Sequence, residues 1–215
     1  MASLPPLSPA LARVAIIIVN WRNAADTLAC LDSLQHLVDQ DVRVIVCDNG
    51  SSDGSVDAMA AWADRALTSG GKGYAVLQED QLASAKPSEY LTIIASRRNL
   101  GFAGGNNLGL RLALADPGIE AFWLLNNDTE VLPDSLQALR ARMAEDTSIG
   151  LCGSTLVYHF DKQTVQAAAG YYNLKLGVGR EIGQGLTVAT LPPRDEVEAQ
   201  MSYPPGASMI ASRAF

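Results

Sequence analysis

Four runs of apolar residues, each followed by a helical pattern, organise the first two thirds of the chain. After each run, apolar residues recur at three- and four-residue steps, which is typical of helices. This alternation predicts an α/β fold with a mainly parallel sheet, helices on both faces and right-handed crossovers. The runs themselves are continuous and end abruptly at polar residues, as strands covered on both faces do. They are Val14–Val19, Val42–Cys47, Leu91–Ala95 and Phe122–Leu125.

The segments outside these units show weaker patterns. Residues 64–90 contain a short apolar stretch, Tyr74–Leu77, inside an insertion whose shape the sequence leaves open. Short apolar stretches and many glycines in residues 149–190 predict antiparallel strands and hairpins that add to the sheet. Residues 191–200 are polar and contain two prolines, so we expect a mobile segment there.

The two ends of the chain set the expected bounds of the domain. Residues 1–12 are rich in proline and serine, and we expect a loose tail. The remaining residues, 13–215, are expected to form one domain. Near its end, Tyr203–Ser212 has the pattern of a turn that leads into one more strand, for which the sequence shows no obvious partner.

Polar residues follow all four predicted parallel strands at the same end. In open parallel sheets the carboxyl ends of the strands form one edge, and ligands bind there. Taken singly, each ending is also typical of an Asn/Asp turn that joins a strand to a helix. Four such endings in register predict a shared crevice. In strand order, the residues are Asn20; Asp48 and Asn49; Arg98 and Asn99; and Asn127 and Asp128.

Composition and charge narrow the class of protein. The chain has 215 residues, of which 48% are hydrophobic and 18% charged, as is typical of a globular protein with a sizeable core. Its net charge of −7 disfavours a general nucleic-acid binder, which needs a basic face. Cys30, Cys47 and Cys152 stand singly among apolar residues, so we expect reduced, buried thiols in a cytoplasmic protein.

The isolated aromatic residues and histidines are more typical of structural positions than of sugar-binding or metal-binding sites. We expect Trp21, Trp123 and Phe102 to pack within the protein, although Trp21 lies at the predicted crevice and can also meet a sugar. His36 and His159 have no paired metal-ligand spacing, and we expect both to be surface or strand residues.

Five segments of the chain resemble the successive motifs of family 2 glycosyltransferases. VAIIIVNWRN, VIVCDNGSSDGS, RNLGFAGGNNLGL and WLLNNDTEVLPDSL follow the family's order and spacing, and YPPGASMIASRAF resembles its acceptor-side G-A-x-M segment. The similarity is greatest to the rhamnosyltransferase-like branch. It implies the GT-A fold and an inverting transfer of a sugar to a glycan or lipid-linked acceptor. The implied donor is a dTDP- or UDP-sugar, with rhamnose as one candidate.

The resemblance implies that the polar crevice binds a nucleotide. Asp48 or Asn49 can hydrogen-bond the edge of a base, but Asp48 can instead cap the helix that follows it. Arg98 can contact the base or the diphosphate, or be a solvated arginine. The helix start at Ala103–Asn107 offers N–H groups to negative charge, whereas its glycines can also serve a tight turn alone. The implied nucleotide-binding residues are Val19, Asn20, Asp48, Asn49, Arg98, Asn99, Gly104, Asn106 and Asn127.

Asp128 corresponds to the last position of the family's D-x-D metal motif. The first acid of that motif is absent, because this chain has Asn126-Asn127-Asp128. One carboxylate, diphosphate oxygens and water can complete the shell of Mg²⁺ or Mn²⁺, and such an oxygen-only site disfavours zinc. We expect weak metal binding in the absence of the donor, with Asn127 near the ribose.

On the acceptor side, the resemblance implies roles for Gly206, Ala207 and Met209. The family's catalytic base lies in an E-D-type motif downstream, so we expect the base beyond Phe215. The chain is therefore expected to be the N-terminal piece of a longer transferase, one that binds nucleotide but turns over poorly. Any membrane contact, at the inner face, would come from the missing parts. The sequence leaves the oligomeric state open.

Three other functions compete with sugar transfer. A non-catalytic sugar-nucleotide-binding module of the same fold is favoured by Asn126 and by the missing base. A nucleotidyltransferase would carry a glycine-rich basic loop after the first strand, but Val19–Arg22 contains no glycine. A dehydrogenase fingerprint also belongs after the first strand, whereas the glycines of this chain follow the third.

Overall fold

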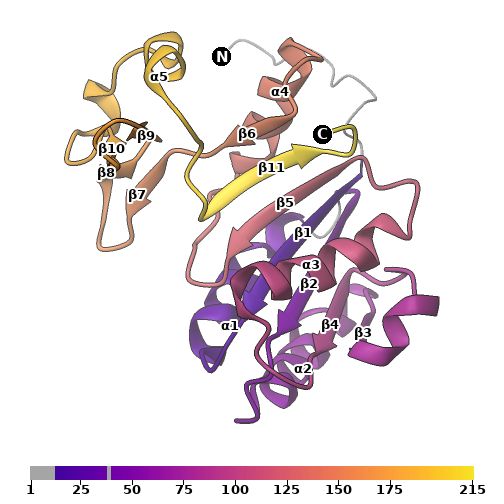
Figure 1. Ribbon diagram of the computed structural model, residues 1–215. Coiled ribbons are helices and arrows are strands. Elements are labelled where there is room, and N and C mark those ends of the chain that lie inside the picture. Colours follow the sequence, from indigo (N-terminus) through magenta and orange to yellow (C-terminus); the bar gives the residue numbers. More distant parts are fainter. Residues whose placement is uncertain (1–12, 38–39) are drawn as a thin grey trace.

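The computed structural model describes residues 13–37 and 40–215, so the predicted loose tail, residues 1–12, lies outside the described residues. A seven-stranded sheet forms the centre of the molecule, with the strand order β3-β4-β2-β1-β5-β11-β6 (Figure 1). The first five strands in this order are parallel, whereas β11 is antiparallel to both of its neighbours. The strands are β1 (Val14–Asn20), β2 (Val42–Asp48), β3 (Tyr74–Gln78), β4 (Leu91–Ala95), β5 (Ala121–Asn126), β6 (Leu151–Gly153) and β11 (Ser208–Ser212).

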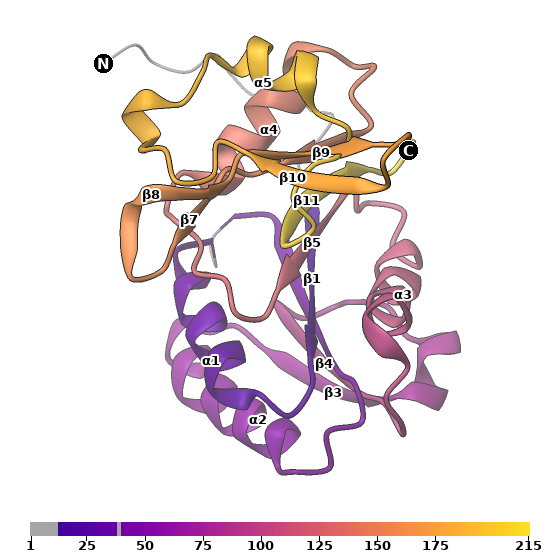
Figure 2. The same cartoon turned by 60° about the vertical axis from the view of Figure 1, so that its left-hand side comes forward.

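Helices cover both faces of the sheet, as Figure 2 shows with the sheet seen nearly edge-on. Side chains of α1, α2 and α4 pack on one face, where Ile16 and Ile18 of β1 meet Leu31 and Met59. On the other face, α3 packs Leu108 against alternate residues of the same strands. Because β1 is buried on both faces, its sequence is apolar without alternation. The helices are α1 (Ala24–Ser33), α2 (Ser55–Ala66), α3 (Gly101–Leu114) and α4 (Ser135–Glu145).

Gly109 lies where α3 crosses β1. A Cβ atom at this position would lie 2.6 Å from Cγ2 of Ile17. Overpacking of this kind costs about 1–3 kcal/mol, more than the gain of up to about 1 kcal/mol in helix propensity. We therefore expect Gly109→Ala to lower the free energy of unfolding in urea. Gly70→Ala is the control, since a Cβ there meets nothing within 4 Å. An equal effect of the two substitutions would contradict this close approach.

The C-terminal part consists of short antiparallel strands and one helix, and it lies above β5 and β11 in Figure 1. Two hairpins, β7–β8 and β9–β10, form small sheets of their own. The prediction of antiparallel strands in residues 149–190 is thus confirmed, although only β6 joins the main sheet. The elements are β7 (Leu156–Tyr158), β8 (Asp161–Ala167), β9 (Ala169–Asn173), β10 (Val178–Ile182) and α5 (Arg194–Gln200). Short 3₁₀ turns cover Gln35–Leu37, Thr68–Gly70, Glu79–Ser84 and Val188–Thr190.

Three segments differ from the sequence-based expectation. The insertion of open shape contains β3, which extends the sheet beside β4 as a fifth parallel strand. The expected mobile segment 191–200 instead forms α5, because Val197 is buried and the Arg194 guanidinium lies 2.9 Å from Glu145. The last strand has two partners rather than none, since β11 is inserted between β5 and β6.

The three cysteines are free, but they differ in burial. Cys30 and Cys47 are buried as expected, and burial raises the pKa of each thiol to about 12. Burial also raises the pKa of the Cys152 thiol, but Cys152 is only partly buried and reagents can therefore reach it more easily. Because the thiolate is the reactive form, we expect iodoacetamide at pH 8 to alkylate Cys152 first. Peptide mass spectrometry would check this, and labelling of Cys30 or Cys47 at the same rate in the native protein would contradict it.

Among the helices of the described residues, none combines the length and the apolar character that a bilayer crossing requires.

Candidate functional site

The strand ends that carry the polar residues lie at one edge of the sheet. In the register of the parallel pairs, Asn20 lies beside Asp48, and Val19 lies beside Asn126. The backbone continues this contact beyond the strands, because the amide of Ser96 donates to the carbonyl of Asp48 at 3.0 Å. The structure thus brings the ends of β1, β2, β4 and β5 together.

A chain of side-chain hydrogen bonds joins three of these strand ends. Asn20 Nδ2 donates to Asp48 Oδ1 at 2.7 Å, and Thr27 Oγ1 donates to Asn20 Oδ1 at 2.8 Å. Asn127 Nδ2 then donates to Thr27 Oγ1 at 3.0 Å. Asn20 and Thr27 are completely buried, so each bond stabilises polar atoms that water does not reach. The network fixes the loop after β5 relative to β1 and β2.

Asp48 has a structural role at the start of the loop after β2. Its side chain accepts hydrogen bonds from the Ser51 hydroxyl at 2.6 Å and from the Ser51 amide at 3.1 Å, in addition to the bond from Asn20. The residue is only 3% exposed. These bonds organise the turn before α2, although α2 itself begins at Ser55, and there Asp53 accepts the amide hydrogen bond. A carboxylate has about four acceptor positions, so Asp48 retains capacity for a base N–H.

Asn49 connects the loop after β2 to the start of α3. Its Nδ2 donates to Asn99 Oδ1 and to the Gly101 carbonyl, both at 3.0 Å, while its Oδ1 accepts from the Leu100 amide at 2.9 Å. Both N–H groups of the Asn49 side chain and one of the two acceptor positions of its oxygen are therefore used within the protein. Asn99 is exposed and also accepts from the Gly101 amide at 2.7 Å.

The glycines of α3 allow the helix to approach the strand ends. The helix begins at Gly101, two residues earlier than the sequence suggested. A Cβ on Gly105 would lie 2.8 Å from Val19 Cγ1, so glycine permits this contact. Gly104 is partly exposed, whereas Asn106 is buried and donates to the Phe102 carbonyl inside the helix. Asn106, which was expected to bind nucleotide, thus points its side chain into the helix and not toward the surface.

Several side chains at this edge are open to solvent. Arg98 is exposed. Trp21 is 51% exposed, with the Arg22 guanidinium 5.5 Å from its ring centre, and Phe102 is 55% exposed. The expectation that Trp21 and Phe102 pack in the interior is therefore wrong. It is confirmed for Trp123, whose Nε1 donates to Ser208 Oγ at 2.9 Å.

Asp128 is exposed and opens on a cavity of about 240 Å³, which we call the Asp128 cavity. The loop after β5, the β7–β8 hairpin and the start of β11 line this cavity. Glu130 lies in its wall, and its carboxylate is 2.7 Å from Nζ of Lys162 and 3.4 Å from Nδ1 of His159. The hydrogen bond from Lys162, together with its charge, lowers the pKa of Glu130.

The residues around Asp128 fit a hard cation only in part. Within residues 13–37 and 40–215, no three His, Cys, Asp or Glu side chains form a metal-binding group. Within the same ranges, the Asp128 carboxylate makes no hydrogen bond or ion pair, so its oxygens are free for a ligand. Oδ1 of Asn126 is buried and has no hydrogen-bond partner. A carboxylate oxygen such as that of Asp128 suits Mg²⁺ or Mn²⁺ provided that a ligand, such as a diphosphate, supplies further oxygens.

Of the three acceptor-side residues, Gly206 and Ala207 precede β11 and Met209 lies within it. Gly206 is exposed, and the Ala207 carbonyl accepts from the amide of Asn126 at 2.9 Å. Ala207 also lines the Asp128 cavity, whereas Met209 pairs with Leu124 and Gly153 inside the sheet. The structure therefore brings Ala207 to Asp128 but holds Met209 within a strand.

Sequence reasoning missed four residues of this region. Thr27 links Asn20 to Asn127, Ser51 binds Asp48, and Glu130 and Lys162 form the wall of the Asp128 cavity. Only Ser51 had a signal, since it lies in a Ser/Asp cluster. The other three act across distant segments, which a single sequence does not show.

The solved structures to which this chain is similar include glycosyltransferases. A mannosyltransferase from Pyrobaculum calidifontis, solved with GDP-Man and Mn²⁺, matches with a TM-score of 0.51 at 22% identity, over 73% of this chain and 39% of its own. Glucosyl-3-phosphoglycerate synthase from Mycobacterium tuberculosis, solved with UDP, matches with a TM-score of 0.48 at 17% identity, over 94% of this chain and 57% of its own. This chain spans less than two thirds of either structure.

The family comparison covers most of the chain. A search of curated proteins found no match. The family model described as glycosyl transferase family 2 matches residues 15–179, which include β1 to β5 with their polar ends, Asp128 and the β7–β8 hairpin. The expected family and GT-A fold are thereby confirmed: the chain belongs to glycosyl transferase family 2.

Proposed function

We propose that the chain binds the nucleoside diphosphate of a sugar donor at the carboxyl edge of its sheet and, as part of a longer transferase, directs transfer of that sugar. The observation that carries the proposal is the hydrogen-bonded chain Asp48–Asn20–Thr27–Asn127. It fixes the loop bearing the free Asp128 carboxylate beside the ends of β1 and β2. Family membership supplies the reaction class.

The nucleotide is assigned to the surface between the loops after β1, β2 and β4. Asp48 retains acceptor capacity for a base N–H, and the exposed Arg98 offers a cation to the base or the diphosphate. Trp21 lies on the solvent side of the same edge. Asn127, tied to Thr27, is assigned to the ribose side. A dTDP- or UDP-sugar, with rhamnose as one candidate, is the proposed donor.

A divalent cation is proposed to bind at Asp128 together with the donor diphosphate. When bound, Mg²⁺ or Mn²⁺ neutralises negative charge on the departing diphosphate. The acceptor hydroxyl attacks the anomeric carbon with inversion, the bond from that carbon to the diphosphate oxygen breaks, and the hydroxyl proton passes to a base. Glu130 is a weak candidate for this base, because Lys162 lowers its pKa. A base beyond Phe215 stays a prediction.

A non-catalytic nucleotide-sugar-binding module is the second candidate. It is favoured by Asn126 at the position of the first metal-binding acid, and by the engagement of Glu130 with Lys162. The two candidates share the donor site and differ in turnover.

Calorimetric titration with UDP and dTDP, each with and without Mn²⁺, tests the proposed function. Asp128 alone provides few ligands to the cation, so the cation and the nucleotide diphosphate should bind together. We therefore expect Mn²⁺ to strengthen binding of at least one nucleotide. Absence of binding in all four titrations would exclude the donor site. Turnover of a nucleotide sugar by the longer gene product would exclude the non-catalytic module.

A further inference from the structure

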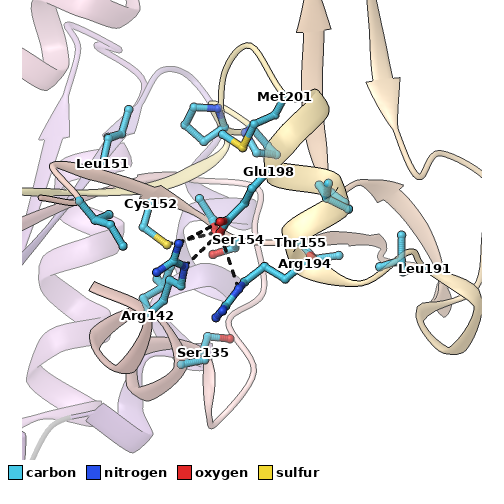
Figure 3. Close-up of a pocket in the computed structure, with 18 of the residues that line it drawn as sticks. Ser135, Arg142, Leu151, Cys152, Ser154, Thr155, Leu191, Arg194, Glu198 and Met201 are labelled. Carbon is cyan, nitrogen blue, oxygen red and sulfur yellow. Dashed lines mark hydrogen bonds and ion pairs between the residues drawn. The ribbon is translucent and has the colours of Figure 1, made fainter. Parts of the chain in front are cut away.

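A second, larger cavity of about 860 Å³ lies between α4, β6 and α5, and we call it the α4–α5 cavity (Figure 3). Its volume falls within the range of about 300–1,000 Å³ that is typical of small-molecule sites. Apolar side chains from separate segments dominate its wall. Leu139 comes from α4, Leu151 from β6, Val197 from α5, and Leu191 and Met201 from the flanks of α5.

The charged groups at this cavity are already paired. Figure 3 shows Arg142, Arg194 and Glu198 pointing toward one another. Nη2 of Arg142 lies 2.9 Å from Oε2 of Glu198, and Nη1 of Arg194 lies 2.9 Å from Oε2 of Glu145. These pairs hold α5 against α4 and leave neither guanidinium unpaired. The cavity therefore suits an uncharged, apolar ligand group rather than an anion.

The α4–α5 cavity adjoins the Asp128 cavity. Ser135, Ser154 and Thr155 line both. Ser154 Oγ and Ser208 Oγ lie 2.7 Å apart, so the shared wall continues toward β11 as a row of hydroxyl groups. One wall of the molecule thus changes from apolar, between α4 and α5, to hydroxyl-lined and then to acidic at Asp128.

We propose that the α4–α5 cavity binds the aliphatic part of an amphipathic acceptor, whose hydroxyl-bearing end lies in the Asp128 cavity. This inference rests on the proposed function and narrows the acceptor class to molecules with a long alkyl or prenyl chain. A ligand that spans both cavities would bury its chain against Leu139, Leu151 and Val197. Its polar end would meet the hydroxyl groups that the two cavities share.

Methyl NMR of the ¹³C-methionine-labelled full chain tests this proposal with alkyl β-glucosides below micelle formation. Met201 lines the cavity, whereas Met59 is completely buried among α1 and α2. We expect decyl glucoside to shift the Met201 signal and leave Met59 unchanged, and methyl glucoside to shift neither. Affinity should rise about fourfold per added methylene group between the octyl and decyl compounds. An unshifted Met201 signal, or equal shifts of both signals, would overturn the proposal.

Two tryptophan substitutions on α4 provide a matched pair. Ala138 is exposed and lines the cavity, so Ala138→Trp should fill it and weaken decyl glucoside binding by about tenfold or more. Gln137 is exposed on the same helix outside both cavity walls, and Gln137→Trp should leave binding unchanged. Equal effects of the two substitutions would overturn the proposal. If Ala138→Trp fails to fold, the wild-type Met201 shift still decides.

A UDP titration of the same samples separates this inference from the proposed function. Alkyl glucoside binding without UDP binding would exclude the proposed donor site. The apolar cavity would then have no link to sugar transfer, and its assignment to an acceptor would be wrong as well. UDP binding without alkyl glucoside binding would overturn the acceptor class alone.

Discussion

Replacing Asp128 by asparagine is expected to abolish the effect of Mn²⁺ on nucleotide binding. The carboxylate is exposed and is the proposed protein ligand of the cation. Asparagine keeps the size of the side chain but removes its charge, and a hard cation prefers charged oxygen ligands. UDP affinity in the presence of Mn²⁺ should fall about tenfold or more. Isothermal titration calorimetry with and without Mn²⁺ measures this change.

The same substitution should leave stability unchanged, which separates a binding role from a structural one. Within the described parts of the chain, Asp128 makes no hydrogen bond or ion pair, so the free energy of unfolding should change by less than about 0.5 kcal/mol. Asp57→Asn, at an exposed position on α2, is the matched control for the loss of one charge. A Mn²⁺ effect that persists in Asp128→Asn would show that the cation binds elsewhere.

Replacing Asp48 by alanine is expected to destabilise the fold strongly. The substitution removes the acceptor of hydrogen bonds from Asn20 Nδ2 and from the amide and hydroxyl of Ser51. All three residues are buried, so water does not replace the carboxylate. Leaving such donors unsatisfied costs about 1–3 kcal/mol each, and we expect a total loss of about 3 kcal/mol. Urea denaturation followed by circular dichroism measures it.

The control for Asp48→Ala is Asp57→Ala, since Asp57 is exposed on α2. Its expected effect on the free energy of unfolding is at most about 1 kcal/mol, because Asp57 lies in the first turn of α2, where a negative charge is stabilised by the helix N-terminus. A loss below about 1 kcal/mol for Asp48→Ala would contradict the structural role of the network. In that case Asp48 would serve the base alone, as the resemblance first implied.

Four of the five parallel strands could be predicted because they are largely buried on both faces, whereas β3 is only partly buried. Val14–Val19 and Val42–Cys47 are continuous apolar runs, and such runs have few alternatives to a central strand. β11 gave no comparable signal. Its position between β5 and β6 depends on pairing with residues of β5 more than eighty positions away and with residues of β6 more than fifty positions away, which local patterns do not encode. α5 was missed because a single buried residue, Val197, and ion pairs with α4 hold it in place.

The location of the candidate site was more predictable than its internal contacts. The ends of adjacent parallel strands necessarily meet, so Asn20, Asp48 and Asn127 were expected at one edge. Which of them bond to each other depends on side-chain positions that only the packed structure fixes. Thr27 illustrates this, because its place on α1 gives no hint that it bridges β1 and the loop after β5. The same holds for Lys162, which reaches Glu130 from β8.

The insertion of β11 has a consequence for the order of folding. Among the described strands, β6 pairs with β11 alone, so its ladder forms only after Ser208–Ser212 have been synthesised. The five parallel strands have all their parallel partners once Asn126 has emerged from the ribosome, and only the antiparallel pairing of β5 with β11 is still to form. A nascent chain can therefore assemble the parallel strands first, and the region that carries the two cavities must wait for Ser208–Ser212.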